Sequence, residues 1–263
     1  MTIPKIIHYC WFGGNQLPKL AQKCIASWQK FLPDYQIKRW DETNFNLQAC
    51  AYVQEAYQAK KYAFVSDYAR FAILHKYGGL YFDTDVELIR PLDNILSRGA
   101  FMGLQSDFDS TIGINPGLGL AVAPGLGLYK ELLDAYHERH FLNVDGTYNV
   151  TTVVTYTTEI LKKYGLENKP GIQHVAGITI YPKEYFCPKD YVTGKLTTTS
   201  NTVAIHHYTA SWHSPREAYA HQLQGKLVKF FPSKLSGKIS FVLSKIKYEG
   251  IRALLRYVIC KNK

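Results

Sequence analysis

The stretch from Ser66 to Asp93 limits the possible folds of this chain more than any other part of its sequence. Its first half, S-D-Y-A-R-F-A-I-L-H-K-Y, spaces apolar side chains as one face of a helix. The pair Gly78-Gly79 follows, and glycine readily takes the left-handed conformation in which helices end. The next residues, L-Y-F, are too short and too apolar a run for anything except a buried strand. The stretch therefore predicts a helix, a sharp break and a buried strand that ends at two aspartates.

These aspartates, Asp83 and Asp85, are candidates for a metal site. Side chains alternate along extended chain, so we expect both carboxylates on the same side of the strand end. Buried carboxylates are unfavourable without a cationic partner, and hard ions such as Mg²⁺ or Mn²⁺ take oxygen ligands and accept substrate phosphates as further ligands. We predict a site for a metal ion and a diphosphate; the simpler alternative is that D-x-D is only a turn.

The chain contains a second D-x-D, Asp107 and Asp109, which serves as a comparison. Polar residues flank it on both sides, as in a solvated loop, so we expect no function there. Glu87 and Arg90, which follow the first D-x-D, are expected to form a solvated pair.

Strand and helix patterns alternate through the first part of the chain, which favours an open, mostly parallel sheet. The expected elements are a strand over 3–10, a helix over 18–31, a strand over 36–40 and a helix over 42–61. Ligands of such sheets bind beyond the carboxyl ends of the strands. Trp11 follows the first strand in the run H-Y-C-W-F-G-G, and it either stacks on a nucleobase or belongs to the core.

Two further patterns carry polar side chains towards this edge. Asp67 and Arg70 are three residues apart and share one helix face, either as site residues or as a surface ion pair. A late strand over 203–208 ends in the tandem His206-His207. Neighbouring strand residues point to opposite faces, so at most one of these histidines is expected to meet a metal ion.

The run S-D-Y-A-R…Y-G-G-L-Y-F-D-T-D-V-E resembles the DXD-containing sugar-binding region of family 32 glycosyltransferases. That family includes bacterial capsular-polysaccharide transferases and fungal Golgi initiating mannosyltransferases. The run is more distantly similar to the glucosylating clostridial toxins and the family 8 galactosyltransferases, and the resemblance extends from Ile3 to about Trp212. It implies an α/β fold of the GT-A type, a Rossmann-type mixed sheet with flanking helices. It also implies metal-dependent transfer of a hexose from a nucleotide diphosphate sugar to a saccharide or lipid-linked oligosaccharide, with retention of configuration.

The resemblance also implies roles for the residues around the metal. Asp85 matches the metal ligand, and Asp83 matches a residue that touches the ribose and the donor sugar beside it. The family 8 pattern places a third ligand at His207, whereas the toxin pattern places Ser211 and Trp212 at the diphosphate. His207 is the favoured ligand, with Ser211 and the preceding histidine in reserve. A histidine ligand shifts the expected ion from Mg²⁺ towards Mn²⁺.

The donor-binding roles follow in the same way. Trp11 matches a tryptophan that stacks on the uracil of the donor, with Gly13 close by, which makes a UDP-hexose the expected substrate. Asp67 and Arg70 match residues that contact donor hydroxyls, and with the two D-x-D aspartates they form the implied catalytic set. Asn149 is a weaker candidate for contact with the donor.

Two other functions are compatible with these residues. A sugar nucleotidyltransferase uses a similar sheet and metal, and a saccharide- or nucleotide-binding module that lacks turnover uses a similar site. The first requires a glycine-rich loop with a basic residue near the N-terminus, but Gly13-Gly14 is followed by no basic residue until Lys19.

The C-terminal part of the chain differs in charge from the rest. Residues 225–263 contain eight lysines and two arginines against one glutamate, so they carry +9 of the total +10. We therefore expect a glycosyltransferase domain over 1–214 and a basic amphipathic helical extension over 215–263. Basic amphipathic helices bind anionic membrane surfaces, and the alternative is a helical appendage docked on the body. No nucleic-acid recognition motif is present, so we expect no nucleic-acid partner.

The five cysteines are scattered and form no C-x-x-C, which predicts neither a disulfide framework nor a zinc site. The sequence shows no signal peptide and no apolar run long enough for a membrane span. These features predict a cytoplasmic protein, with a peripheral position at the inner face of the membrane as an option through its tail.

Overall fold

The computed structural model describes residues 2–106, 111–209 and 214–261. The chain divides into two compact units. Unit 1 contains Met1–Pro188 and Thr197–His207, and unit 2 contains Lys189–Leu196 and Tyr208–Lys263. The division into domains at residue 214 stays a prediction.

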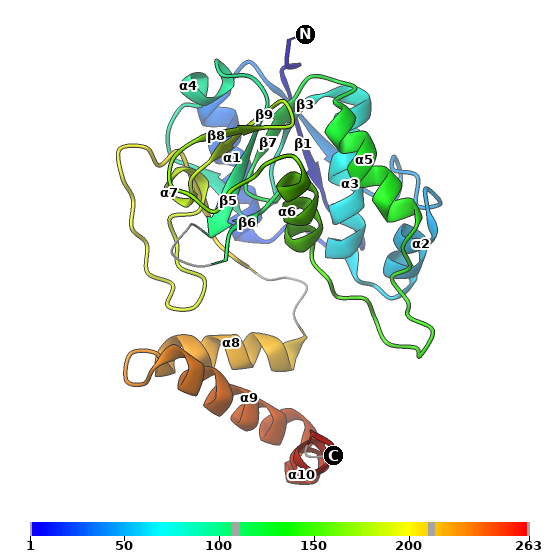
Figure 1. Cartoon of the computed structure of the whole chain (residues 1–263), viewed down its shortest axis with the longest axis vertical. Coiled ribbons are helices and arrows are strands. Elements are labelled where there is room, and N and C mark those ends of the chain that lie inside the picture. Colours follow the sequence, from blue (N-terminus) through cyan, green and yellow to red (C-terminus); the bar gives the residue numbers. More distant parts are fainter. Residues whose placement is uncertain (1, 107–110, 210–213, 262–263) are drawn as a thin grey trace. The chain divides into compact units, whose positions relative to one another are not determined.

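Unit 1 is built on a sheet with the strand order β2-β1-β3-β7-β5-β9-β8, in which β6 pairs with β5 (Figure 1). The strands are β1 (Ile6–Cys10), β2 (Gln36–Trp40), β3 (Gly79–Tyr81), β5 (Phe101–Ser106), β6 (Gly113–Ile114), β7 (Leu120–Val122), β8 (Gln173–Val175) and β9 (Ile178–Tyr181). The β1–β2, β1–β3 and β5–β9 pairs are parallel, whereas β7 is antiparallel to both β3 and β5. The expectation of a mostly parallel sheet is therefore wrong, and the predicted Rossmann-type mixed sheet is confirmed.

Helices cover the sheet, as the sequence predicted. The longer ones are α1 (Lys19–Phe31), α2 (Ala51–Gln58), α3 (Tyr62–Tyr77), α5 (Gly127–His137) and α6 (Val153–Lys163), and the short ones are α4 (Asp93–Leu96) and α7 (Lys183–Phe186). Helix α3 lies beside α5 and ends where expected, with Gly78 at φ 62° (Figure 1). The helix expected over 42–61 is confined to α2, because residues 41–50 form turns instead.

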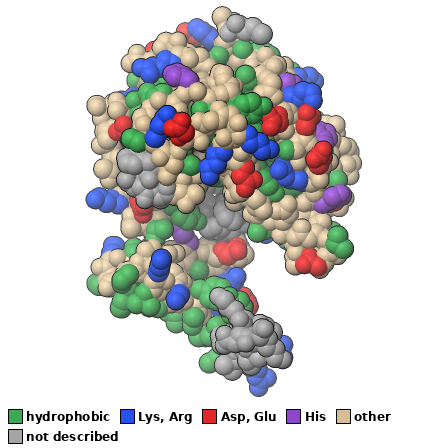
Figure 2. All heavy atoms as spheres, in the orientation of Figure 1, with side chains coloured by type: hydrophobic (Ala, Val, Ile, Leu, Met, Phe, Trp, Pro, Cys, Tyr) green, Lys and Arg blue, Asp and Glu red, His purple; other side chains and the backbone are tan. Residues whose placement is uncertain are grey.

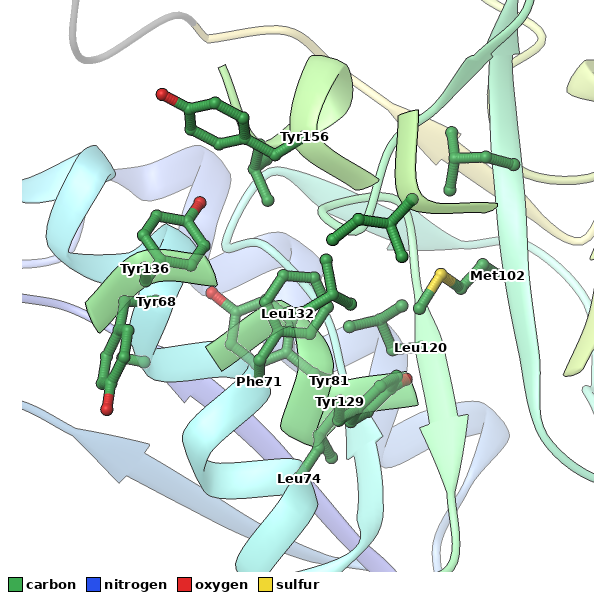
Figure 3. Packing of buried hydrophobic residues seen from close by; sticks show 14 of the residues in the cluster. Tyr68, Phe71, Leu74, Tyr81, Met102, Leu120, Tyr129, Leu132, Tyr136 and Tyr156 are labelled. Carbon is green, nitrogen blue, oxygen red and sulfur yellow. The ribbon is translucent and has the colours of Figure 1, made fainter. Parts of the chain in front are cut away.

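The core around α3 consists of aromatic and aliphatic side chains from several elements (Figure 3). Phe71 of α3 meets Tyr129 of α5 with ring centroids 5.3 Å apart, and Tyr68 meets Tyr136 at 5.8 Å, both edge to face. Edge-to-face pairs add to the free energy gained from burial alone. Because nine of the sixteen residues of α3 are buried, Asp67 is carried on a helix that is packed on several sides.

A second, two-stranded sheet joins distant parts of unit 1. Strand β4 (Val86–Leu88) pairs antiparallel with β10 (Ala204–His206), with His206 opposite Val86. Helix α1 anchors β4, because the Trp28 indole N–H donates to the Val86 carbonyl at 2.7 Å. This pairing brings the segment after the D-x-D motif to the end of a strand more than a hundred residues away in the sequence.

Unit 2 is helical, which confirms the predicted basic helical tail. It contains α8 (Pro215–Leu227), α9 (Ser233–Glu249) and α10 (Ile251–Lys261). Ser214 and Glu217 form a capping box at the start of α8, and Gly250 separates α9 from α10 with φ 84°. Among the described residues, no helix combines the length and the apolar character needed to cross a bilayer.

Candidate functional site

The ends of strands β1 and β3 place the predicted site at one edge of the sheet. The strands are parallel neighbours, and the Phe82 N–H donates to the His8 carbonyl just beyond the paired residues. Trp11 follows β1, and Asp83 follows Phe82, so both lie at adjacent carboxyl ends. This is the edge at which ligands bind in open α/β sheets.

The D-x-D motif is a turn rather than extended chain. The Val86 N–H donates to the Asp83 carbonyl at 3.0 Å, which closes a turn through Thr84 and Asp85. The expectation that extended chain would point both carboxylates to the same side is therefore wrong. The turn leads the two carboxylates to different partners, one on α3 and the other on β10.

Asp83, whose side chain is 29% exposed, joins a charge network with the buried Asp67 and Arg70. Nη2 of Arg70 lies 2.8 Å from Oδ1 of Asp67 and 3.3 Å from Oδ1 of Asp83. Arg70 is only 3% exposed, so the alternative of a surface ion pair is wrong. Burying charged groups is unfavourable unless they pair with one another. The ion pairs of Arg70 with the two carboxylates meet that requirement.

Neighbouring groups hold the Arg70 guanidinium in place. Its Nε donates to the Ser66 carbonyl at 3.1 Å, and its Cζ lies 5.0 Å from the centroid of the Tyr81 ring. The Tyr81 hydroxyl donates to the same Asp83 oxygen at 3.0 Å. Nη1 of Arg70 is buried, and no described group accepts a hydrogen bond from it. A buried donor without a partner costs about 1–3 kcal/mol, so an oxygen of a ligand is the natural acceptor here.

Burial shifts the ionisation of this network. It raises the pKa of Asp67 to about 7, and the Arg70 charge offsets only part of that effect. Burial opposes the Arg70 charge as well, but Asp83, Tyr81 and Asp67 together raise the pKa of Arg70 above its usual value. The guanidinium therefore stays positive beside the two carboxylates.

Asp85 meets a histidine on β10. Nε2 of His206 lies 3.1 Å from Oδ1 of Asp85, and both residues are buried. Burial lowers the pKa of His206, but the charge and hydrogen bond of Asp85, together with Cys187, outweigh that effect, and the pKa rises to about 10. The imidazole is therefore positively charged at neutral pH, and it sits beside the carboxylate that the sequence predicts as a metal ligand.

The neighbouring histidine has a different partner. Nε2 of His207 lies 2.8 Å from Oε2 of Glu87, and Glu87 also pairs with Lys23 at 2.8 Å. The expected solvated pair of Glu87 with Arg90 is therefore wrong, since Arg90 donates instead to the Thr199 carbonyl at 2.7 Å. The role of His207 as a metal ligand stays a prediction.

A turn between β6 and β7 closes the site from another direction. The Gly117 carbonyl accepts from the Asp83 N–H at 3.1 Å, and a Cβ on Gly117 would collide with Oδ2 of Asp83. The Asn115 side chain holds the turn, because its Oδ1 accepts from the Gly117 N–H at 2.7 Å. Only glycine permits this approach. Sequence reasoning missed both this contact and Tyr81, since neither pairing has a local signal.

The loop after β1 presents Trp11 at the edge of the sheet. Trp11 is half-buried rather than part of the core, and its indole N–H donates to the Asn15 carbonyl at 2.7 Å. Gly13 has φ 94° and packs so closely on Tyr62 that a Cβ would overlap the ring, while its N–H donates to Glu42. The glycine thus shapes the loop that carries the tryptophan.

The remaining predicted residues are Asn149, Ser211 and Trp212. Asn149 belongs to the loop between α5 and α6, where its Nδ2 lies 3.1 Å from the Tyr156 hydroxyl and its N–H donates to the Phe141 carbonyl. These contacts shape the loop itself. Ser211 and Trp212, like the comparison pair Asp107 and Asp109, lie outside the described residues.

The donor set suits a hard divalent ion that a substrate helps to hold. Within residues 2–106, 111–209 and 214–261, no group of three or more His, Cys, Asp or Glu side chains is arranged to bind a metal ion. Asp83 and Asp85 supply carboxylate oxygens, and Mg²⁺-type sites commonly use one or two carboxylates together with substrate phosphates. The residues fit a metal that arrives with a diphosphate rather than a preformed protein cage.

A family model matches much of the sequence that forms this edge. Residues 18–102 match the family described as "Glycosyltransferase sugar-binding region containing DXD motif". The match includes Asp67, Arg70, Asp83 and Asp85. Residues 18–102 of this chain therefore resemble a DXD glycosyltransferase sugar-binding region. The predicted resemblance is confirmed, and Asp67, Arg70 and Asp83 lie within the matched residues.

Two curated relatives have related names. The chain is 36% identical over 105 residues to inositol phosphoceramide mannosyltransferase 3 of Schizosaccharomyces pombe, which covers 38% of this chain and 29% of that protein. Inositol phosphoceramide mannosyltransferase 1 of the same yeast is 28% identical over 111 residues, covering 38% and 33% of the two chains. The similarity thus spans about a third of each relative's length.

Among solved structures, the chain is similar to one described as "PaToxG Glycosyltransferase". The two are 18% identical with a TM-score of 0.45, and the similar part covers 61% of this chain and 69% of the other.

Proposed function

We propose that this protein is a metal-dependent, retaining glycosyltransferase. It transfers a hexose from a nucleotide diphosphate sugar, with a UDP-sugar as the first candidate, to a hydroxyl of a saccharide or lipid-linked oligosaccharide. One observation carries the proposal: the matched region holds the buried Asp67–Arg70 pair in contact with Asp83, beside the turn that presents Asp85. The names of the curated relatives make mannose the second candidate for the transferred sugar.

The network is suited to binding the hydroxyl groups of a donor. Carboxylates accept hydrogen bonds from sugar and ribose hydroxyls, and the buried Nη1 of Arg70 has a hydrogen to donate to an oxygen of the donor. Because Tyr81 and Ser66 already hold Arg70 and Asp83, these groups need little reorganisation when the donor binds. Trp11, half-buried at the neighbouring strand end, is the proposed stacking surface for the base.

Asp83 and Asp85 would hold the divalent ion together with the donor diphosphate, with Mn²⁺ or Mg²⁺ as the ion. When bound, the metal neutralises negative charge on the leaving nucleotide. His207, His206 and Ser211 stay candidates for a further ligand, and Trp212 is the proposed donor of a hydrogen bond to the β-phosphate.

Retention follows from the family resemblance. We infer attack of the acceptor hydroxyl on the same face from which the nucleotide departs. The bond from the anomeric carbon to the departing phosphate oxygen breaks as the bond to the acceptor oxygen forms, and a β-phosphate oxygen takes the acceptor proton. Arg70 would then stabilise developing charge without changing its own protonation.

The direct test is incubation of the full chain with Mn²⁺ or Mg²⁺ and a panel of UDP- and GDP-hexoses. Slow release of nucleoside diphosphate from one donor supports the transferase. Formation of a nucleoside triphosphate from the sugar nucleotide and pyrophosphate would indicate a nucleotidyltransferase, and binding without turnover would indicate a binding module.

A matched pair of variants tests the site within that assay. Asp85→Asn should lower metal-dependent turnover by about a hundred-fold or more, since loss of metal-based charge stabilisation is worth several kcal/mol. Asp109→Asn makes the same chemical change in the second D-x-D and should leave turnover unchanged. Near-normal turnover of Asp85→Asn would refute the metal assignment.

A further inference from the structure

Helix α9 in unit 2 is packed with its polar side chains inward. Its buried residues are Ser236, Ser240 and Ser244, which recur every four residues along one face. A helix packed in water normally buries its apolar stripe instead. We call this buried row the serine seam.

The serine seam is internally satisfied and lets helices approach closely. The Ser236 hydroxyl donates to the Phe231 carbonyl at 3.2 Å, and the Ser240 and Ser244 hydroxyls donate to carbonyls within α9. Helix α8 packs along α9, with the Gln224 side chain close to Gly237. Interfaces built from small residues are characteristic of helices whose apolar side chains face lipid.

The apolar side chains of α9 lie on a different face. Leu235, Ile239, Val242 and Ile246 recur at helical spacing and form one stripe. Leu235 is 45% exposed, while Val242 and Ile246 are each 37% exposed. The turn before α9 adds two phenylalanines, of which Phe230 is 79% exposed. Contiguous exposed apolar surface of this kind marks an interaction site.

Basic side chains border the apolar stripe. Lys234 and Lys238 each directly precede a stripe residue and are exposed. Figure 2 shows hydrophobic and basic side chains together on the surface of the helical unit. Residues 225–263 carry a net charge of +9, with Glu249 as their only acidic residue. Glu249 is already paired with Lys245 and Arg216.

We propose that the α9 stripe and the Phe230-Phe231 turn bind the surface of an anionic lipid bilayer. The apolar side chains enter the boundary between headgroups and acyl chains, while the lysines reach the anionic headgroups. Charge complementarity selects this partner, because a purely apolar protein groove would not need a border of lysines. At 17 residues, or about 25 Å, α9 lies along the surface rather than across it. The proposal does not depend on the transferase activity.

The test is flotation of the full-length protein with vesicles of phosphatidylcholine containing phosphatidylserine, and with vesicles of phosphatidylcholine alone. We expect binding to the anionic vesicles, weakened when salt shortens the Debye length from about 10 Å towards 3 Å. The double variant Lys234→Gln and Lys238→Gln should bind about thirty-fold more weakly, from roughly 1 kcal/mol per basic residue at the surface. The variant Leu235→Gln with Ile246→Gln should also lose most binding. Its fold should be kept, because both positions are exposed and glutamine is a good helix former.

Matched controls keep the outcome decisive. Lys162→Gln with Lys163→Gln removes two exposed charges from unit 1 and should leave vesicle affinity within about two-fold of the parent. Equal binding by all three variants, or no binding to either vesicle, would overturn the proposal. Two results with Leu235→Gln and Ile246→Gln would also overturn the membrane proposal, if vesicle binding persisted. One is loss of a concentration-dependent dimer, and the other is a sharp fall in melting temperature. Those results would assign the stripe to a second copy or to the protein's own body.

Discussion

A buried histidine beneath the site makes the stability of unit 1 depend on pH. His8 on β1 is 1% exposed, and the Trp40 indole N–H donates to its Nδ1 at 3.1 Å. Its Nε2 lies 3.0 Å from the Gly78 carbonyl, at the end of α3. Because Nδ1 accepts and Nε2 donates, the imidazole is neutral with its proton on Nε2. A second proton, on Nδ1, would place its N–H against the N–H of the Trp40 indole.

The size of the effect follows from the pKa shift. Burial lowers the pKa of His8 from 6.5 to about 4, opposed only in part by the Gly78 carbonyl. Between pH 6.5 and pH 4, His8 binds a proton in the unfolded chain but not in the folded chain. The neutral His8 therefore contributes its full stabilisation above pH 6.5, and this contribution is lost as the pH falls towards 4. The loss between pH 7 and pH 5 is about 2 kcal/mol, and it approaches roughly 3 kcal/mol below pH 4.

The measurement is urea unfolding followed by tryptophan fluorescence at pH 7, 6 and 5. The variant His8→Gln keeps an amide that can hydrogen-bond, but it removes the titration. Its unfolding free energy should be lower at pH 7 and should fall by about 2 kcal/mol less than that of the parent between pH 7 and pH 5. His174→Gln, which removes an exposed histidine, should keep the parent's slope. Identical slopes for His8→Gln and the parent would refute the reasoning.

Three further predictions concern the site. Gly117→Ala should reduce donor turnover by about ten-fold or more, because the new methyl group displaces the Asp83 carboxylate. Gly127→Ala, whose Cβ meets no atom, should leave turnover unchanged. Equal turnover of both variants would contradict the close approach of Gly117 to Asp83. The charged His206 should stabilise the fold fully below pH 6.5 and lose that effect as the pH rises through about 10. The unfolding free energy of His206→Gln should therefore fall less than that of the parent between pH 7 and pH 10. An equal fall in both proteins would contradict the pairing of His206 with Asp85. Arg70→Lys should lower the unfolding free energy by about 1–3 kcal/mol, because an ammonium cannot reach both carboxylates and the Ser66 carbonyl at once; a change within experimental error would show that the charge alone suffices.

Local patterns predicted the elements around the site well. The helix that ends at Gly78, the short strand before Asp83 and the strand that ends at His206 were all readable from spacing, glycine placement and apolar runs. The prediction of an extended D-x-D was wrong, because a backbone hydrogen bond closes a turn there. The prediction of a mostly parallel sheet was wrong, because strand direction is set by pairings between segments far apart in the sequence.

The sequence by itself determined that a helix, a glycine break and a strand deliver two aspartates to an edge, because those features depend on residues within a few positions of one another. Only the tertiary structure decided that His206 rather than His207 faces Asp85, because the register of β4 on β10 makes that choice across more than a hundred residues. The same holds for α9. Its sequence contains both a serine row and an apolar row, and only packing against α8 shows which of them is buried.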